Sequence, residues 1–197
     1  MKRIVITGGP QSGKSTATRA LKREFGNKIL LIPESATILI TKAFPKPGED
    51  IPYSPEWQAA FTNAILPLQR ERENAWELVA KDRGIKVVVC DRGIMDNAAY
   101  ADGHIKDFLV NNNLVIEELY GRYDCVIHLE SVAVCNPDLW GKAGNNIRYE
   151  DPDRARFLDQ RIREAWKSHP TWHYIPGNAG IRAVVKQVKV IVKSYLD

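Results

Sequence analysis

Short apolar segments and stretches of helical periodicity alternate along the chain. The apolar segments are 2–7, 28–32, 86–90, 125–129 and, with a weaker pattern, 172–175. Runs of this length that are rich in branched side chains are typical of parallel strands buried on both faces. The pattern therefore predicts a parallel sheet of about five strands.

Apolar residues at helical spacing fill much of the sequence between these segments. They recur over residues 56–81, 152–167 and 181–195. Pro67 lies inside the first of these stretches and predicts a kink or a break there. Asp151 stands immediately before the second stretch as a predicted N-cap. Alternating strands and helices predict an α/β fold with helical layers on both sides of the sheet.

Two segments lack either periodicity. Residues 44–55 are rich in proline, and residues 131–150 are rich in glycine and asparagine. Neither segment is long enough to link two domains, so we expect one domain over residues 1–197. Long loops on a rigid scaffold are often lids or binding loops, and residues 131–150 are the candidate lid loop.

The composition excludes several classes of protein. The 197 residues are 44% hydrophobic and 26% charged, as in globular proteins, which excludes a disordered chain and a collagen-like repeat. The longest apolar runs have four residues, whereas a membrane helix needs about 20, so no membrane span is expected. The N-terminus also lacks the apolar region of a secretory signal. We therefore expect a cytoplasmic protein whose three widely spaced cysteines are reduced.

The charge balance restricts the partners. The net charge is +4, with 28 basic and 24 acidic residues. A small surplus suits an anionic small molecule, whereas nucleic-acid-binding proteins usually carry a stronger basic patch. Nucleic acid is therefore an unlikely partner, and the sequence does not indicate an oligomeric state.

A phosphate-binding motif follows the first predicted strand directly. GGPQSGKST fits the pattern G-x-x-x-x-G-K-[ST], in which glycines let successive backbone N–H groups point at phosphate oxygens. The helix expected after it adds its positive N-terminal end, and Lys14 would reach the β- and γ-phosphates. The motif predicts binding of ATP or GTP. The residues expected around the nucleotide are Gly8, Gly9, Pro10, Gln11, Ser12, Gly13, Lys14, Ser15 and Thr16.

Two residues are candidates for holding Mg²⁺. The Ser15 hydroxyl is the P-loop ligand expected for this ion. Asp91 ends the apolar strand 86–90, where a carboxylate can hold Mg²⁺ through water. A helix-capping role is the alternative for Asp91.

Three further residues are candidate catalytic groups. Glu34 follows the second predicted strand and could take a proton from an acceptor hydroxyl or hold a metal-bound water. Arg92 could clamp an anionic group of the acceptor, with a salt bridge as the alternative. Arg148, in the candidate lid loop, could cover the γ-phosphate and stabilise charge in the transition state.

Gln69, Arg70 and Glu73 follow the expected break at Pro67. They could contact the base or sugar of an acceptor. The alternative is that they lie on an exposed helix face.

Several motifs resemble known families. DRGIMDNAAY (91–100) is similar to the D-R-Y-x-x-S-x-x-A-Y signature of thymidylate kinases, with Gly93 and Asp96 in place of the Tyr and Ser. PES (33–35) resembles the P-E-P of deoxynucleoside kinases, in which the Glu is the general base. Together with GGPQSGKST, RYDCVIHLE and the segment NNIRYEDPDRARFLDQRIREAWKSHP, these pieces resemble the NadR-like AAA-type ATPase domain. That P-loop group includes the ribosylnicotinamide kinase domain and the TRPL-translocation-defect proteins.

The resemblance implies a thymidylate-kinase-like fold that uses ATP or GTP with Mg²⁺. The first hypothesis is a phosphotransferase that moves the γ-phosphoryl group to a nucleoside-like or other small hydroxylated acceptor. The second is a nucleotide-dependent regulatory NTPase or switch that binds lipid or protein, in which slow hydrolysis changes loop order. The third and least favoured is a polynucleotide end-kinase, because the basic groove lined by aromatic residues that it would need is not evident.

Overall fold

A computed structural model describes residues 1–141 and 151–196. Its strands form one parallel sheet in the order β2-β3-β1-β4-β5. The strands are β1 (Lys2–Thr7), β2 (Ile29–Ile32), β3 (Val87–Asp91), β4 (Cys125–Leu129) and β5 (Trp172–Ile175). All five predicted strands are confirmed, and β2 and β3 begin one residue later than the apolar pattern indicated.

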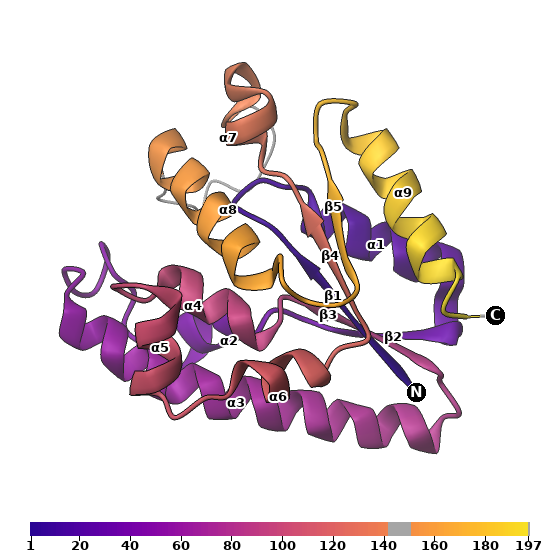
Figure 1. Cartoon of the computed structure of the whole chain (residues 1–197), viewed down its shortest axis with the longest axis horizontal. Helices are drawn as coiled ribbons and strands as arrows, with labels where there is room; N and C mark the ends of the chain where they lie inside the picture. The colour runs from indigo at the N-terminus through magenta and orange to yellow at the C-terminus, as the bar shows by residue number, and fades with distance from the viewer. Residues whose placement is uncertain (142–150, 197) are drawn as a thin grey trace.

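Helices cover both faces of the sheet (Figure 1). In the described residues they are α1 (Lys14–Phe25), α2 (Ser35–Lys42), α3 (Pro55–Asp82), α4 (Asn97–Tyr100), α5 (Ile105–Asn111), α6 (Ile116–Gly121), α7 (Val132–Cys135), α8 (Pro152–Trp166) and α9 (Ile181–Lys193). Short 3-10 turns occur at Gly26–Lys28, Ile94–Asp96 and Pro137–Leu139. Asp151 caps α8 as expected, because its side chain accepts a hydrogen bond from the Arg154 amide. No helix in the described ranges combines the length and hydrophobicity that crossing a bilayer requires.

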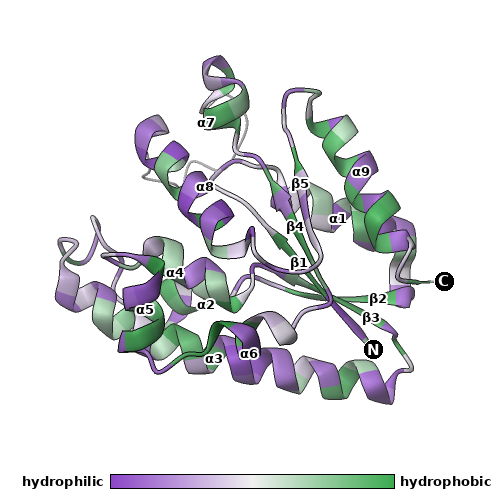
Figure 2. Ribbon diagram, in the orientation of Figure 1, coloured by the Kyte–Doolittle hydropathy of each residue, from purple (hydrophilic) through white to green (hydrophobic). Residues whose placement is uncertain are grey.

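Alternate residues of each strand point to two separate cores. Ile4 and Ile6 of β1 pack with α1 and α9, while Val5 between them packs on the opposite side of the sheet with residues of α4 and α8. This alternation explains why the strands are apolar throughout. Figure 2 shows the central strands as largely hydrophobic, while α8 is hydrophilic over much of its length. The three-layer α/β prediction is confirmed.

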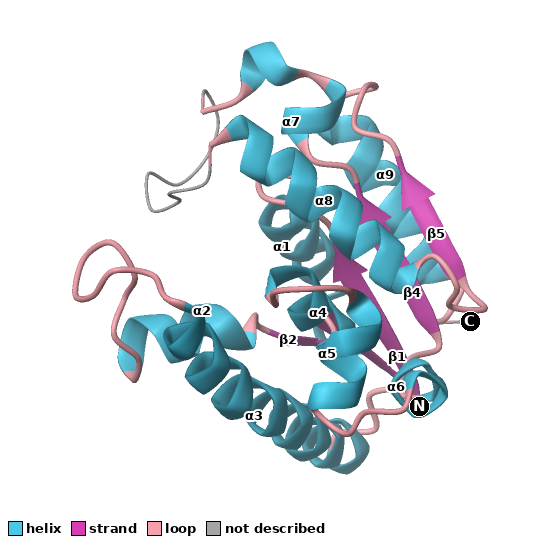
Figure 3. Cartoon of the chain, turned by 60° about the vertical axis from the view of Figure 1, so that its left-hand side comes forward, coloured by secondary structure: helices cyan, strands magenta, loops and turns pink. Residues whose placement is uncertain are grey.

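A third, smaller core lies between α2 and α3. Leu39 of α2 packs with Phe61 and Ile65 of α3, and Trp57 stacks on Phe61 with ring centroids 5.0 Å apart. In Figure 3, α2 and the first half of α3 extend to one side of the sheet, after the end of β2. Glu34, which the sequence predicts as a candidate catalytic residue, lies where this extension begins.

Two sequence-based expectations were wrong in part. Of the kink or break expected at Pro67, the break does not occur, since α3 runs without interruption from Pro55 to Asp82. Burial of its inner face, including Ile65 and Gln69, holds the helix together despite the backbone hydrogen bond that proline cannot donate. The segment 131–150 is not irregular throughout, because α7 and the turn at 137–139 occupy part of it.

Candidate functional site

The P-loop joins β1 to α1 at the carboxyl end of the central strand. Gly13 has φ +88°, in the left-handed region that favours glycine, so a side chain there would strain the loop. Lys14 is buried at the start of α1, and its Nζ donates hydrogen bonds of 2.8 Å to the carbonyl oxygens of Gly8 and Gly9. The loop therefore holds its lysine ammonium folded over its own backbone.

This arrangement can bind an anion. Helix α1 begins at the loop, so its positive end faces the space that the loop encloses. Ser15 and Thr16 lie exposed in its first turn. A phosphate oxygen can replace a carbonyl as partner of the Lys14 ammonium, since both are hydrogen-bond acceptors.

Asp91 ends β3 beside the P-loop strand, in register with Ile6. Its Oδ1 is buried and has no hydrogen-bond partner in the described parts of the chain. Burial raises the pKa of Asp91 and Glu34 raises it further, against the opposing effects of Lys14 and Arg92. An unpartnered buried carboxylate oxygen beside a second carboxylate is an environment that a cation would stabilise.

These residues fit a Mg²⁺ ion. The ion prefers oxygen ligands and is usually held by one or two protein groups, with the rest supplied by water and phosphates. Asp91 and the Ser15 hydroxyl are such groups. Within residues 1–141 and 151–196, no three His, Cys, Asp or Glu residues are placed to hold a metal together. Asp91 and Ser15 therefore fit a Mg²⁺ ion whose other ligands are water and nucleotide phosphates.

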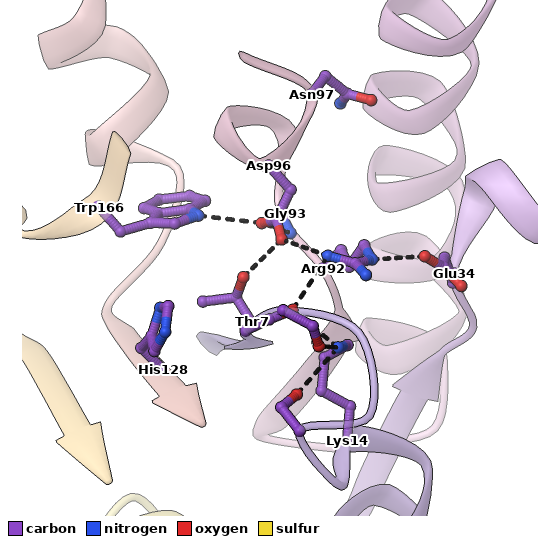
Figure 4. Close-up of polar contacts among 12 residues, drawn as sticks. Thr7, Lys14, Glu34, Arg92, Gly93, Asp96, Asn97, His128 and Trp166 are labelled. Atoms are coloured by element: carbon purple, nitrogen blue, oxygen red, sulfur yellow. Dashed lines mark hydrogen bonds and ion pairs between the residues drawn. The ribbon is translucent and has the colours of Figure 1, made fainter. Parts of the chain in front are cut away.

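Arg92 lies at the centre of a buried polar network (Figure 4). Its φ is +72°, in the left-handed region that non-glycine residues rarely adopt, and its side chain is 7% exposed. The guanidinium is paired with Glu34 through Nε and with Asp96 through Nη1, at 3.0 Å for the latter. Nη1 also lies 3.3 Å from the Gly8 carbonyl oxygen. The salt-bridge alternative describes these contacts, and a clamp on the acceptor remains a prediction.

Glu34 immediately precedes α2 and faces Arg92. Burial raises its pKa, but Arg92, the Thr37 hydroxyl and Lys14 together outweigh burial and lower the pKa to about 2. The Thr37 hydroxyl donates to Glu34 Oε2 at 2.6 Å. Glu34 is therefore held as a carboxylate near the P-loop lysine, with both oxygens engaged.

Asp96 was not among the site residues predicted from the sequence. This buried carboxylate accepts hydrogen bonds from Thr7, Arg92, Gly93 and Trp166, the last two at 3.0 and 2.9 Å. It links the end of β1 to the Asp-Arg turn and to α8. The only signal in the sequence was its place in the thymidylate-kinase-like signature, where it stands for a serine.

Gln69 and Glu73 were predicted either to contact an acceptor or to lie on an exposed helix face. Gln69 and Glu73 are buried, so the exposed-face alternative was wrong for both. Gln69 lies beside the site. Its side-chain nitrogen donates to the Arg92 carbonyl oxygen at 3.4 Å, and its side-chain oxygen accepts from Asn97 Nδ2 at 3.0 Å. Glu73 instead accepts hydrogen bonds from Arg3, Arg122 and Tyr123, and Arg3 is near the start of β1. These contacts engage both Glu73 carboxylate oxygens, and a contact of Glu73 with an acceptor stays a prediction.

The Arg148 prediction lies outside the described residues, as does most of the candidate lid loop. The three cysteines are free, and Cys90 and Cys125 are buried, as expected.

Comparisons with known proteins agree with this fold. A family model described as an AAA domain matches residues 3–179. A search of curated protein sequences finds no significant match. Thymidylate kinase from Candida albicans is similar in structure, with a TM-score of 0.65 and 19% identity over 100% of this chain and 93% of that one. Deoxyadenosine kinase from M. mycoides, solved with bound dATP, has a TM-score of 0.50 and 15% identity over 97% and 99%. These likenesses confirm the predicted thymidylate-kinase-like P-loop fold.

Proposed function

The chain belongs to the AAA-domain family, and from the geometry of its site we propose that it is a Mg²⁺-dependent kinase. It would transfer the γ-phosphoryl group of ATP or GTP to a hydroxyl of a nucleoside-like or other small acceptor. The observation that supports this most is the convergence of Lys14, Asp91 and the Glu34–Arg92 pair at the carboxyl ends of three adjacent strands. The names of the two structural neighbours support an acceptor related to nucleosides or nucleotides.

The donor would bind in the P-loop. Lys14 would exchange the carbonyl oxygen of Gly8 for a phosphate oxygen and keep its bond to the Gly9 carbonyl oxygen, and the loop amides would complete the cradle. Ser15 and Asp91 would hold Mg²⁺, which supplies positive charge against the phosphate oxygens when it is bound. Because phosphoryl transfer passes through a loose transition state, positioning and charge would provide most of the rate enhancement.

The acceptor would bind beside Glu34. A carboxylate with a pKa of about 2 is a weak base, but it is always ionised near neutral pH and accepts a hydrogen bond well. We propose that Glu34 orients the acceptor hydroxyl and takes its proton late, as the new P–O bond forms. Arg92 would hold Glu34 in place through the ion pair that the pair already makes.

A regulatory NTPase or switch is the second candidate. The observation that favours it is the engagement of both Glu34 oxygens by Arg92 and Thr37, which leaves this carboxylate satisfied without an acceptor. In such a protein water would attack the nucleotide slowly, and no acceptor would raise the turnover.

A panel of nucleosides, nucleotides and oligonucleotides, tested for ATP- and GTP-dependent phosphorylation, separates the two candidates. The kinase proposal predicts that one class of acceptor stimulates turnover, and that Glu34→Gln lowers this turnover by about 10²-fold or more with nucleotide affinity nearly unchanged. Glu49→Gln is the matched control, since Glu49 is exposed in the proline-rich loop. Turnover that no acceptor stimulates would favour the switch. If Glu34→Gln retained full acceptor-dependent turnover, Glu34 would be excluded as the proton acceptor.

Nucleotide binding has its own test. Mg-ATP or Mg-GTP should raise the unfolding midpoint of the wild type, because a ligand of the native state stabilises it by mass action. Lys14→Ala should reduce that rise. Equal shifts in both proteins would exclude the P-loop as the binding site.

A further inference from the structure

A second polar network reaches the P-loop from α8 and does not include Arg92. Asp159 on α8 is 3% exposed. Its Oδ1 accepts a 2.8 Å hydrogen bond from the backbone amide of Gly9, which is 150 positions earlier in the chain. The same oxygen accepts a 3.1 Å hydrogen bond from the Ser131 amide, which follows β4 closely. One buried carboxylate oxygen therefore joins α8, the end of β4 and the P-loop.

The packing around this contact is close. A Cβ added at Gly9 would lie 2.8 Å from both Cβ and Oδ1 of Asp159, so only glycine lets α8 approach the loop this far. Ser131 adds a second link, because its hydroxyl donates to the carbonyl oxygen of Pro10. Ser131 is itself completely buried. The first turn of the P-loop is thus fixed from outside at two consecutive residues.

This contact bears on the lysine of the P-loop. The Gly9 peptide nitrogen faces Asp159, while the Gly9 carbonyl oxygen accepts the 2.8 Å hydrogen bond from Lys14 Nζ. The orientation of Gly9 therefore links Asp159 to the group that would bind the β- and γ-phosphates. The Gly9 amide is also engaged by a carboxylate, so the phosphates must be bound by amides later in the loop.

We propose that Asp159 is a positioning residue for nucleotide binding: through Gly9 it fixes the P-loop in the arrangement that places Lys14. The inference rests on the proposed nucleotide binding but concerns a residue outside the motif. The same contact connects α8, which begins at residue 152, to the P-loop through Asp159. A displacement of α8 would move Gly9 and with it the lysine.

The test compares Asp159→Ala, which removes the acceptor oxygen, with Asp159→Asn, which can present an amide oxygen to both N–H groups. Asp153→Asn is the matched control, because Asp153 is on the same helix, with its side chain 89% exposed. The measurements on the full chain are the dissociation constant of Mg-ATP, the unfolding midpoint without nucleotide and the exchange rate of the Gly9 amide proton.

We expect Asp159→Ala to weaken Mg-ATP binding about tenfold, the order of one charge-assisted hydrogen bond, and to speed exchange at Gly9. Asp159→Asn should recover most of the Mg-ATP affinity and most of the protection of the Gly9 amide from exchange. Asp153→Asn should change neither the affinity nor the exchange rate. A purely structural role would lower the midpoint and leave the dissociation constant of the folded protein as in the wild type, and this result would overturn the proposal.

A second variant keeps the proposal testable if Asp159→Ala does not fold. Gly9→Ala disturbs the same contact from the other side, by placing a methyl group against Asp159. It should weaken Mg-ATP binding to a similar extent, with Ser131→Ala showing a smaller effect. Unchanged affinity in Gly9→Ala would contradict the proposal. A wild type that binds neither Mg-ATP nor Mg-GTP would instead refute the proposed function.

Discussion

Replacing Asp96 by alanine removes the carboxylate that joins the P-loop strand, the Asp-Arg turn and α8. Four donors lose their acceptor together: the Thr7 hydroxyl, Arg92 Nη1, the Gly93 amide and Trp166 Nε1. All of them are held in an interior in which Arg92 is 7% exposed and Trp166 fully buried. The perturbation therefore leaves one cation and three neutral donors without this partner.

The expected loss of stability can be worked from these contacts. Removing one member of a buried ion pair costs about 3–5 kcal/mol, and a buried neutral donor left unsatisfied costs about 1–3 kcal/mol. Arg92 keeps Glu34 as a second carboxylate partner, and water can enter the vacated space, so the sum is an upper bound. We expect Asp96→Ala to lower the free energy of unfolding by about 4 kcal/mol. For a chain of this size the midpoint would fall by about 8–16 °C.

Urea and thermal unfolding of the protein without nucleotide measure this loss. Asp96→Asn should lie between wild type and Asp96→Ala, because an amide keeps one acceptor oxygen but has no charge. The control Asp82→Ala removes an exposed carboxylate at the end of α3 and should change the free energy by less than about 0.5 kcal/mol. A loss below about 1 kcal/mol in Asp96→Ala would refute the assignment of Asp96 as the central acceptor of this network.

Two further predictions concern stability. The folded-state pKa of Glu34 is about 2, below its ordinary 4.5, so its ion pair stabilises the fold above about pH 4.5 and loses this effect as the pH falls toward 2. The difference in unfolding free energy between wild type and Glu34→Gln should therefore shrink between pH 6 and pH 3. A constant difference would contradict the pairing. Pro67→Ala restores a backbone donor for the Asn63 carbonyl inside the continuous helix α3, so it should raise the unfolding midpoint, and a lowered midpoint would show that the proline is favourable there.

The sequence by itself determined the elements that depend on local pattern. Apolar runs marked the inner strands clearly because a central strand of a parallel sheet is buried on both faces, whereas the edge strand β5 gave a weaker pattern because three of its four residues are only half-buried. Asp151 marked the start of α8 because an N-cap is satisfied by the backbone amide three residues later. The P-loop was recognisable because glycine, lysine and serine must be adjacent in the chain to surround one phosphate.

Local pattern failed where burial of distant partners decided the outcome. Pro67 predicts a break from its own chemistry, but the inner face of α3 packs against other parts of the chain and the helix continues. Gln69 and Glu73 are four positions apart on one helix face, yet one meets Arg92 and the other meets Arg3. A spacing rule places them on a common face and does not specify what that face meets.

The tertiary structure alone decided which charged groups meet. Glu34 and Arg92 are 58 positions apart and pair because β2 and β3 are neighbours in the sheet. Asp159 meets Gly9 across 150 positions because α8 crosses the end of β1 at a distance that only glycine allows. A buried carboxylate needs donors, but its sequence neighbours do not show which donors these are. Strand order and helix packing bring them together, and these are properties of the whole chain.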